Sequence, residues 1–311
     1  MVDAYALEFV EPNYEHFDAF LQKAKRPSLL QSFPYAYAIR QTQKLQPRLG
    51  VIKKNEEEIG FFSTFEASTL LGFLHVLTID RGPCWFKGHG NVDDMYGFSK
   101  ALDAYAPARF GRQRRFMPEI SKGQLYRGWK KREREKAYRT IWLDISKDEK
   151  ALQSNMEKKW RNALSKAERQ DQKMEIGNGA DIPWFLQGYL KDRLAKKYPG
   201  PSLSFLKTLM EMAAQSDDLL LLKATQKNRI LAAICVIKHG NAATYQTGWT
   251  TLEGRSANAH HFLLWRAIKM LKEEEIQYLD MGGINTETAK GVTDFKDGIG
   301  GKRAQLIGQF G

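Results

Sequence analysis

The last third of the chain constrains the fold more than any other part of the sequence. It predicts a strand over residues 242–246, a helix over 258–274 with one apolar face, and a strand over 276–281 that ends at Gly282-Gly283. A strand, a helix and a strand within about 40 residues form a crossover unit. Because open α/β sheets bind ligands beyond the carboxyl ends of such strands, the glycine pair and Lys296 are the first candidates for a reactive site.

The composition is that of a globular protein. The chain has 311 residues, enough for one large or two medium domains, and 42% of them are hydrophobic and 12% aromatic. No run of residues approaches the length of a membrane helix, and residues 1–15 are acidic and mixed, unlike a signal peptide. Cys84 and Cys235 are expected to be buried thiols in a reducing cytoplasm, and the six histidines lack metal-ligand spacing, so no metal is assigned.

The positive charge of the chain is unevenly spread. The formal net charge is +12, and +9 of it lies between Arg109 and Arg139, where 12 Lys or Arg residues stand against 3 Glu. Such a concentration indicates an anionic partner: RNA, a nucleotide or an anionic lipid surface. The alternative is a solvated face that only aids solubility, and the sequence favours neither.

Two α/β units follow one another in the sequence. Both show helices, an antiparallel hairpin, a further strand, a helix and a closing strand, so the repeat is architectural. The predicted fold is two tandem mixed, mostly antiparallel sheets flanked by helices. The first domain is expected to cover residues 1–147 with a C-terminal strand at 301–311, and the second to cover 148–300. Residues 147–169 are expected to form one helix, and residues 248–256 a loop.

This layout is that of the N-acyltransferase superfamily, and short motifs narrow it further. The chain resembles the Fem aminoacyltransferases, the peptidoglycan interpeptide-bridge enzymes, which have two tandem GNAT-like N-acyltransferase domains. The resemblance covers nearly the whole chain, which looks like the shorter members without a coiled-coil arm. Its motifs are Gln31-Ser32, Arg81-Gly82-Pro83, Arg115-Phe116-Met117-Pro118-Glu119, residues 140–144 leading into 159–167, Tyr278-Leu279-Asp280-Met281-Gly282-Gly283 and Phe295-Lys296.

The turn before the helix at 258–274 argues against coenzyme A as the donor. Superfamily members that use coenzyme A carry an Arg/Gln-x-x-Gly-x-Gly/Ala turn whose backbone N–H groups hold the pyrophosphate. The corresponding residues here run from Gly254 to His260. Arg255 is present, but both glycines are missing, and the side chains of Asn258 and His260 impede close approach to the backbone. No cofactor is therefore assigned.

The resemblance implies a reaction in which an amino group attacks an aminoacyl ester on tRNA, so that an amide forms and the tRNA leaves. In the family the amine belongs to a stem-peptide lysine. The implied partners are charged tRNA and a peptidoglycan precursor, a peptide linked to a sugar nucleotide or a lipid. A monomer in the cytoplasm is expected, with a peripheral contact at the anionic inner face of the membrane. The chemistry needs a cation near the developing oxyanion and a basic path for tRNA phosphates.

The motifs point to particular side chains for these roles. Lys296 matches the Phe-Lys position of the family and is the candidate catalytic cation; the alternative is a surface lysine paired with Asp294 or Asp297. Arg81 could bind a phosphate or carboxylate, or pair with Asp80 or another acid. The aromatic candidates could be core residues, and the basic ones could be solvated charge. The candidates for substrate binding are Arg81, Tyr37, Tyr245, Arg255, Phe295, Gly282 and Gly283, and those for tRNA binding are Lys158, Arg161 and Lys166.

Two alternatives stay open. An N-acyltransferase of the same fold could use an acyl-CoA or another thioester and act on a different amine. Met117 stands where the family often has an aspartate, which leaves the acceptor open. A non-catalytic basic module on this fold could instead bind RNA or a membrane surface. Binding of acetyl-CoA would favour the first alternative, and salt-dependent binding without turnover the second.

Overall fold

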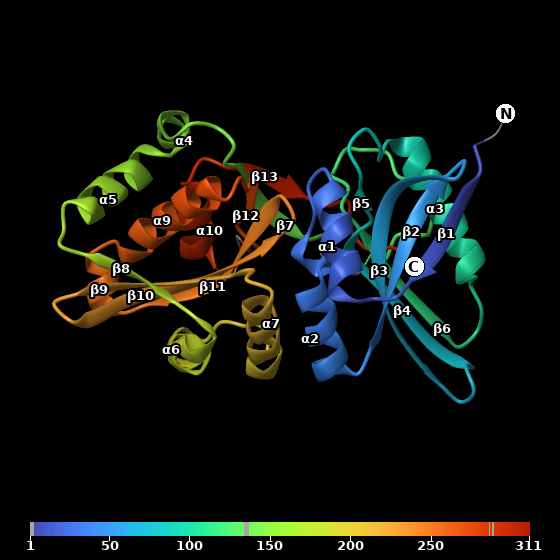
Figure 1. The fold of residues 1–311 in the computed structure, drawn as a ribbon, viewed down its shortest axis with the longest axis horizontal. Coiled ribbons are helices and arrows are strands. Elements are labelled where there is room, and N and C mark those ends of the chain that lie inside the picture. Colours follow the sequence, from blue (N-terminus) through green and yellow to red (C-terminus); the bar gives the residue numbers. More distant parts are fainter. Residues whose placement is uncertain (1–2, 134–136, 286, 288) are drawn as a thin grey trace. The chain divides into compact units, whose positions relative to one another are not determined.

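The described part of the chain forms two compact units, each a mixed sheet flanked by helices as predicted (Figure 1). The computed structural model describes residues 3–133, 137–285, 287 and 289–311. Unit 1 consists of Met1–Tyr138, His239–Asn241 and Gln305–Gly311, and unit 2 of Arg139–Lys238 and Ala242–Ala304. Cys84 and Cys235 are buried free thiols, in agreement with the sequence analysis. None of the described helices is long and apolar enough to cross a membrane.

Unit 1 contains the first half of the chain. Its elements are β1 (Tyr5–Val10), α1 (Tyr14–Lys23), η1 (Leu29–Gln31), α2 (Phe33–Gln43), β2 (Gln46–Lys54), β3 (Glu57–Thr69), β4 (Leu74–Gly82), β5 (Cys84–Trp85), α3 (Val92–Tyr105) and β6 (Arg112–Pro118). The sheet order is β1-β2-β3-β4-β6, with β5 beside β3. The pairs are antiparallel except β4 and β6, which run parallel on either side of the crossover through α3.

Unit 2 contains the larger sheet. Its elements are β7 (Arg139–Asp144), α4 (Glu149–Asn155), α5 (Lys158–Glu168), β8 (Lys173–Gly177), η2 (Gly179–Asp181), α6 (Ile182–Lys196), α7 (Leu203–Gln215), β9 (Leu219–Gln226), β10 (Arg229–His239), β11 (Ala242–Thr250), α8 (Leu252–Ser256), α9 (Ala259–Glu273), β12 (Tyr278–Asp280), α10 (Lys290–Asp297) and β13 (Lys302–Gln305). The sheet order is β13-β7-β12-β11-β10-β9-β8.

The crossover predicted in the last third of the chain is confirmed. Strand β11 pairs parallel with β12 from Ala242–Tyr278 to Thr244–Asp280, and α9 connects the two strands. The buried stripe of α9 includes Phe262, Trp265, Ile268 and Leu271, which pack in the core of unit 2. The β4–α3–β6 crossover of unit 1 has the same form, so the architectural repeat is real.

The units divide at a different point from the expected domain boundary after residue 147. Strand β7 pairs antiparallel with β12, with Asp144 opposite Tyr278, and therefore belongs to the second sheet. The boundary lies after Tyr138. The segment 301–311, expected to join the first domain, is divided as well, because β13 lies beside β7 and only the residues from Gln305 onward join unit 1.

The single helix expected at 147–169 is wrong, because the chain breaks at Met156 between α4 and α5. Met156 has an extended backbone, with φ −65° and ψ 147°. The Glu157 N–H donates to the Gly298 carbonyl at 2.9 Å. A Cβ added to Gly300 would lie 2.4 Å from the Asn155 carbonyl oxygen. The backbone at Gly300 therefore packs directly on the C-terminal end of α4. Contacts with residues far along the chain therefore interrupt a helical pattern.

Two short helices also lie where the sequence pattern predicts none. Helix α8 occupies part of the expected loop at 248–256, and the Thr251 hydroxyl accepts a hydrogen bond from the Gly254 N–H at 3.0 Å as its N-cap. Helix α10 follows the glycine turn and presents only Thr293 and Lys296 as buried residues. Such short elements depend on their caps and tertiary contacts rather than on periodicity.

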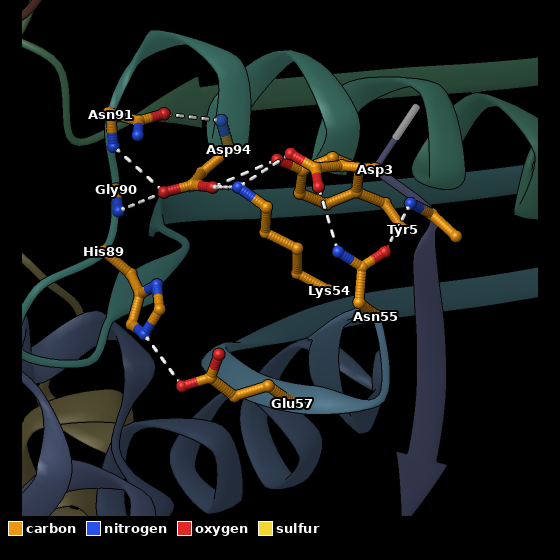
Figure 2. A network of polar contacts seen from close by, with 10 residues as sticks. Asp3, Tyr5, Lys54, Asn55, Glu57, His89, Gly90, Asn91 and Asp94 are labelled. Atoms are coloured by element: carbon orange, nitrogen blue, oxygen red, sulfur yellow. Dashed lines mark hydrogen bonds and ion pairs between the residues drawn. The ribbon is translucent and has the colours of Figure 1, made fainter. Parts of the chain in front are cut away.

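The buried carboxylate of Asp94 ties the first turn of α3 to the sheet of unit 1 (Figure 2). It accepts hydrogen bonds from the Gly90 N–H at 2.9 Å, the Asn91 N–H at 3.3 Å, the Tyr5 hydroxyl at 3.0 Å and the Lys54 ammonium at 3.4 Å. Burial opposes ionisation, but these donors outweigh it and lower the pKa of Asp94. The network fixes α3 against strands β1 and β2.

Candidate active site

Lys296 is buried inside unit 2. Its side chain lies on α10, and only 7% of the residue is exposed. Its Nζ donates to the Gly283 carbonyl at 2.9 Å and lies 5.6 Å from the centre of the Tyr245 ring. Burial lowers the pKa of Lys296 to about 8, while the Asp280 carboxylate opposes the shift. The structure therefore brings Lys296 together with Gly283 and Tyr245, which the sequence analysis also singled out.

The surface alternative for this lysine is wrong, because the two neighbouring carboxylates have other partners. Asp294 pairs with the exposed Lys290 at 2.6 Å, and Asp297 pairs with Arg303. Lys296 instead points into the unit, toward the carboxyl edge of the sheet. An ammonium held there, with few water molecules around it, interacts strongly with any negative charge that develops beside it.

The Asp280 carboxylate holds the glycine turn in place. Gly282 has φ +69°, and a Cβ added there would lie 3.0 Å from the Tyr245 carbonyl oxygen and 3.7 Å from the Lys296 Nζ. The Gly282 N–H donates to the Asp280 carboxylate at 2.8 Å, and the Thr140 hydroxyl also bonds this carboxylate. Glycine is needed here for its conformation and for close approach.

A cluster of neutral rings lies next to the Tyr245 ring that faces the lysine. The Tyr245 hydroxyl lies 3.4 Å from Nε2 of His260. The Phe295 ring packs edge-on against the imidazoles of His260 and His261, at centroid distances of 5.9 and 5.0 Å, and the Trp160 indole N–H donates to the Phe295 carbonyl at 3.0 Å. Burial lowers the pKa of His260 to about 3 and that of His261 to about 4, and it raises the pKa of Tyr245. These groups are therefore uncharged at neutral pH.

Three polar contributors to this site were missed by sequence reasoning: Thr140, Asp280 and His260. Thr140 and Asp280 both lie within Fem-like motifs, so the motif positions carried the signal. Their contact joins β7 to the residue that closes β12, and pairing across strands is invisible to a periodicity argument. His260 was noted only as an obstacle to coenzyme A, whereas its ring faces Tyr245 inside the unit.

The turn between α8 and α9 keeps a left-handed residue without glycine. Asn258 has φ 54°, and its N–H donates to the Arg255 carbonyl at 3.0 Å. A Cβ added to Gly254 would lie only 2.1 Å from the Leu231 carbonyl, so this glycine serves packing. The Arg255 side chain is exposed and stays a candidate for binding an anion.

Arg81 belongs to unit 1, where it is almost fully buried. Its Nε and Nη2 donate to the two Glu119 oxygens at 2.7 and 2.8 Å, and the guanidinium lies 4.9 Å from the centre of the Tyr138 ring. Of the acids that the sequence offered as partners, Asp80 is wrong, because its carboxylate pairs with Arg115 at 2.8 Å. This bidentate pair connects the end of β4 to the residue that follows β6.

The other Fem-like motifs of unit 1 meet at the same place. The Gln31 side chain donates to the Asp80 carbonyl at 2.8 Å and accepts from the Ser63 N–H at 2.6 Å. A Cβ added to Gly82 would lie 2.9 Å from the Gln31 amide carbon. These motif residues therefore interlock as structure. Tyr37 is also in unit 1, half-buried on α2 with its ring 6.1 Å from that of Phe33.

The three basic candidates on α5 differ in their surroundings. The Arg161 guanidinium donates to the Ser154 carbonyl at 3.1 Å and to the Met156 carbonyl, so it closes the C-terminal end of α4. Lys158 and Lys166 are exposed to solvent. Only these two lysines therefore present their charge to a partner in the way that a tRNA path requires.

The basic segment 109–139 presents less free charge than its composition indicates. Several of its arginines make internal contacts: Arg109 with the Phe73 carbonyl, Arg112 with His75, Arg114 with Asp103, Arg115 with Asp80 and Arg132 with the Arg114 carbonyl. Lys122, Arg127, Lys130, Lys131 and Arg139 are exposed. Residues 134–136 of this segment lie outside the described residues.

Comparison with known proteins places this site in a recognised domain. Residues 154–297 match the family described as an acetyltransferase (GNAT) domain. By sequence, no curated protein matches the chain. The structure is similar to that of FemX, with a TM-score of 0.79, 14% identity and coverage of 97% of this chain and 96% of that chain.

Two further solved structures share the tandem architecture. A conserved protein of unknown function from Bacteroides thetaiotaomicron has a TM-score of 0.59 and 11% identity, with 98% of this chain and 97% of that chain covered. A tandem GNAT protein from the clavulanic acid biosynthesis pathway has a TM-score of 0.51 and 9% identity, with 97% of both chains covered. The matched domain and the two sheets define an acyltransferase of tandem GNAT fold. Within that class, the fold is Fem-like over nearly the whole length.

Proposed function

We propose that this acyltransferase is a Fem-like aminoacyltransferase, which moves an aminoacyl group from tRNA to an amine of a peptidoglycan precursor. The observation that carries the proposal is the buried Lys296 ammonium beside the Gly282-Gly283 turn. This cation lies inside the segment that matches the GNAT domain. No cofactor is required, because the ester on tRNA is already activated.

The chemistry follows from the position and charge of the lysine. The acceptor amine attacks the ester carbonyl, a C–N bond forms, and negative charge develops on the carbonyl oxygen. Because the pKa of Lys296 is about 8, its amine is mostly protonated at neutral pH and can stabilise that charge. The bond from carbon to the ribose oxygen then breaks, the ribose oxygen takes up a proton and the nitrogen loses one. An amide and free tRNA result.

The proposed partners are charged tRNA and a precursor peptide linked to a sugar nucleotide or a lipid, met in the cytoplasm or at the inner face of the membrane. Exposed cations support a phosphate-bearing partner: Lys158 and Lys166 lie on α5, and Arg255 lies beside α9 in the same unit. Steep weakening of tRNA binding with salt is the expected signature of such contacts. We expect the protein to act as a monomer.

One specific observation supports a second candidate, transfer from an acyl-CoA thioester, because the matched family is described as an acetyltransferase domain. Against it, the turn before α9 has Asn258 in the left-handed position and no glycine for close approach to a pyrophosphate. The third reading, a basic module without catalysis, finds support in the exposed lysines but gives no role to a buried lysine.

A donor assay separates these functions. Purified protein is incubated with a lysine-containing muropeptide and either radiolabelled aminoacyl-tRNA or radiolabelled acetyl-CoA. We expect label on the muropeptide from tRNA only. Label from acetyl-CoA would support the thioester enzyme, and tRNA binding without transfer to any amine offered would support the binding module.

A further inference from the structure

The tip of the β3–β4 hairpin in unit 1 exposes a cluster of large apolar side chains. Leu71 is fully exposed, Leu70 is 68% exposed and Phe73 is 50% exposed. Phe110, which precedes β6, is 87% exposed, and its ring lies 5.8 Å from that of Phe73. In Figure 1 this turn projects beyond the rest of the sheet, at the lower right. We refer to these four residues as the apolar tip.

The leucines of the tip occupy backbone positions that leucine disfavours. Leu70 has φ 51° and Leu71 has φ 54°, in a hairpin turn where asparagine and glycine are preferred. Two other strand turns of this chain place consecutive residues in the same left-handed region, and both use polar side chains, at 55–56 and 227–228. The conformation of the turn therefore does not explain the two leucines, whereas contact of their side chains with a binding partner does.

An arginine joins the two loops of the tip into one platform. The Arg109 guanidinium donates to the carbonyl groups of Gly72, Phe73 and Phe110. Because Arg109 spans both loops, the apolar side chains are held in place before any partner arrives. The cost of ordering them on binding is correspondingly small.

The two loops that form the tip carry positive charge, whereas Glu66 lies further along the hairpin, where it contacts His75 at 3.1 Å. Residues 67–79 and 104–118 contain no Asp or Glu, and they include Arg109 and Arg112 close to the tip. Arg109 is exposed, so its charge remains within reach of an anionic partner even though its N–H groups bond carbonyls. At a lipid surface, the phosphate headgroups lie outside the acyl chains. The protruding leucine and phenylalanine side chains match the acyl chains, and the arginine behind them matches the phosphates.

We propose that the apolar tip inserts into the surface of an anionic lipid bilayer and anchors the protein there reversibly. Leu71 and Phe110 would enter the acyl boundary, and Arg109 would lie at the level of the phosphates. A bilayer accepts a protruding tip without a matching groove, which a protein partner would need. This anchor does not depend on the acyl donor or on Lys296.

A labelled cysteine tests the insertion directly. Because Cys84 and Cys235 are buried, a thiol introduced by Leu71→Cys can be labelled selectively with an environment-sensitive fluorophore. The control is Glu56→Cys, in a turn of the same backbone conformation but polar sequence. With vesicles of mixed phosphatidylglycerol and phosphatidylcholine, we expect a blue-shifted and brighter signal at position 71 and no change at position 56. Equal responses, or no response at 71, would overturn the proposal.

Co-sedimentation with the same vesicles measures the strength of the anchor. Leu71→Ser with Phe110→Ser is expected to weaken binding by roughly a hundredfold, or about tenfold for each side chain. Leu252→Ser, which removes an 81% exposed leucine from unit 2, should leave it unchanged. Wild-type protein that stays in the supernatant, or a tip variant that binds as wild type, would contradict the anchor. So would a wild-type dimer that the tip variant dissociates, because a second copy would then cover the tip.

Discussion

Replacing Lys296 by methionine is expected to make the protein more stable while it removes the proposed catalytic cation. Burial lowers the pKa of this lysine from 10.5 to about 8, a difference of about 2.5 units. At 1.36 kcal/mol per unit, the folded state loses about 3 kcal/mol by keeping the ammonium charged near neutral pH. Losing the hydrogen bond to the Gly283 carbonyl costs about 1 kcal/mol. The free energy of unfolding should therefore rise by about 2 kcal/mol in Lys296→Met.

The pH dependence of this gain identifies its cause. A lysine whose folded pKa is depressed destabilises the protein below that pKa, and the penalty disappears as pH rises from about 8 toward 10.5. Urea unfolding near pH 7 and near pH 10 should show the advantage of Lys296→Met shrinking to almost nothing. The control is Lys290→Met on the same helix, whose 78% exposed side chain should have little influence at either pH. An advantage that does not change with pH would refute the assigned cause.

Three further substitutions probe other parts of the structure. Glu119→Gln removes the negative charge that pairs with the buried Arg81 and should lower the free energy of urea unfolding by about 3 kcal/mol, whereas Glu253→Gln in an exposed pair should not. Asp94→Asn should cost about 2 kcal/mol at neutral pH; because the folded pKa of Asp94 is lowered, the wild-type advantage should vanish as pH falls below the usual carboxyl range, which an acid titration checks. Gly282→Ala should raise the activation free energy of transfer more than it lowers the free energy of unfolding, because its Cβ would disturb the turn at the lysine. Equal changes of these two free energies, measured in the donor assay and by urea unfolding, would argue against that.

Much of the fold was predictable because it rests on local signals. The helix predicted at 258–274 is α9, and the strands predicted at 242–246 and 276–281 are β11 and β12. The break between α4 and α5 was not predictable, since it depends on Gly298 and Gly300, more than a hundred residues away. The division between units likewise depends on the pairing of β7 with β12.

The candidate site was predictable in part, because some of its residues lie in short local motifs. The glycine pair and the Phe-Lys motif pointed to one edge of the second sheet, and the structure brings Lys296 to the Gly282-Gly283 turn. The burial of the lysine, and hence its low pKa, comes from packing against Tyr245 and its neighbours, which a pattern in one segment cannot show. How much of the charge of segment 109–139 is free was not predictable for a related reason, because a count of arginines does not reveal which groups they bond.

The most direct test of the central claim is a single-turnover transfer assay with Lys296→Met beside Lys290→Met. Each variant is mixed in excess with radiolabelled aminoacyl-tRNA and a lysine-containing muropeptide, and the rate of amide formation is measured. Loss of the cation beside the developing oxyanion should slow Lys296→Met by about a hundredfold or more, with Lys290→Met unchanged. A folded Lys296→Met protein that transfers at the wild-type rate would contradict the claim that this buried lysine takes part in catalysis.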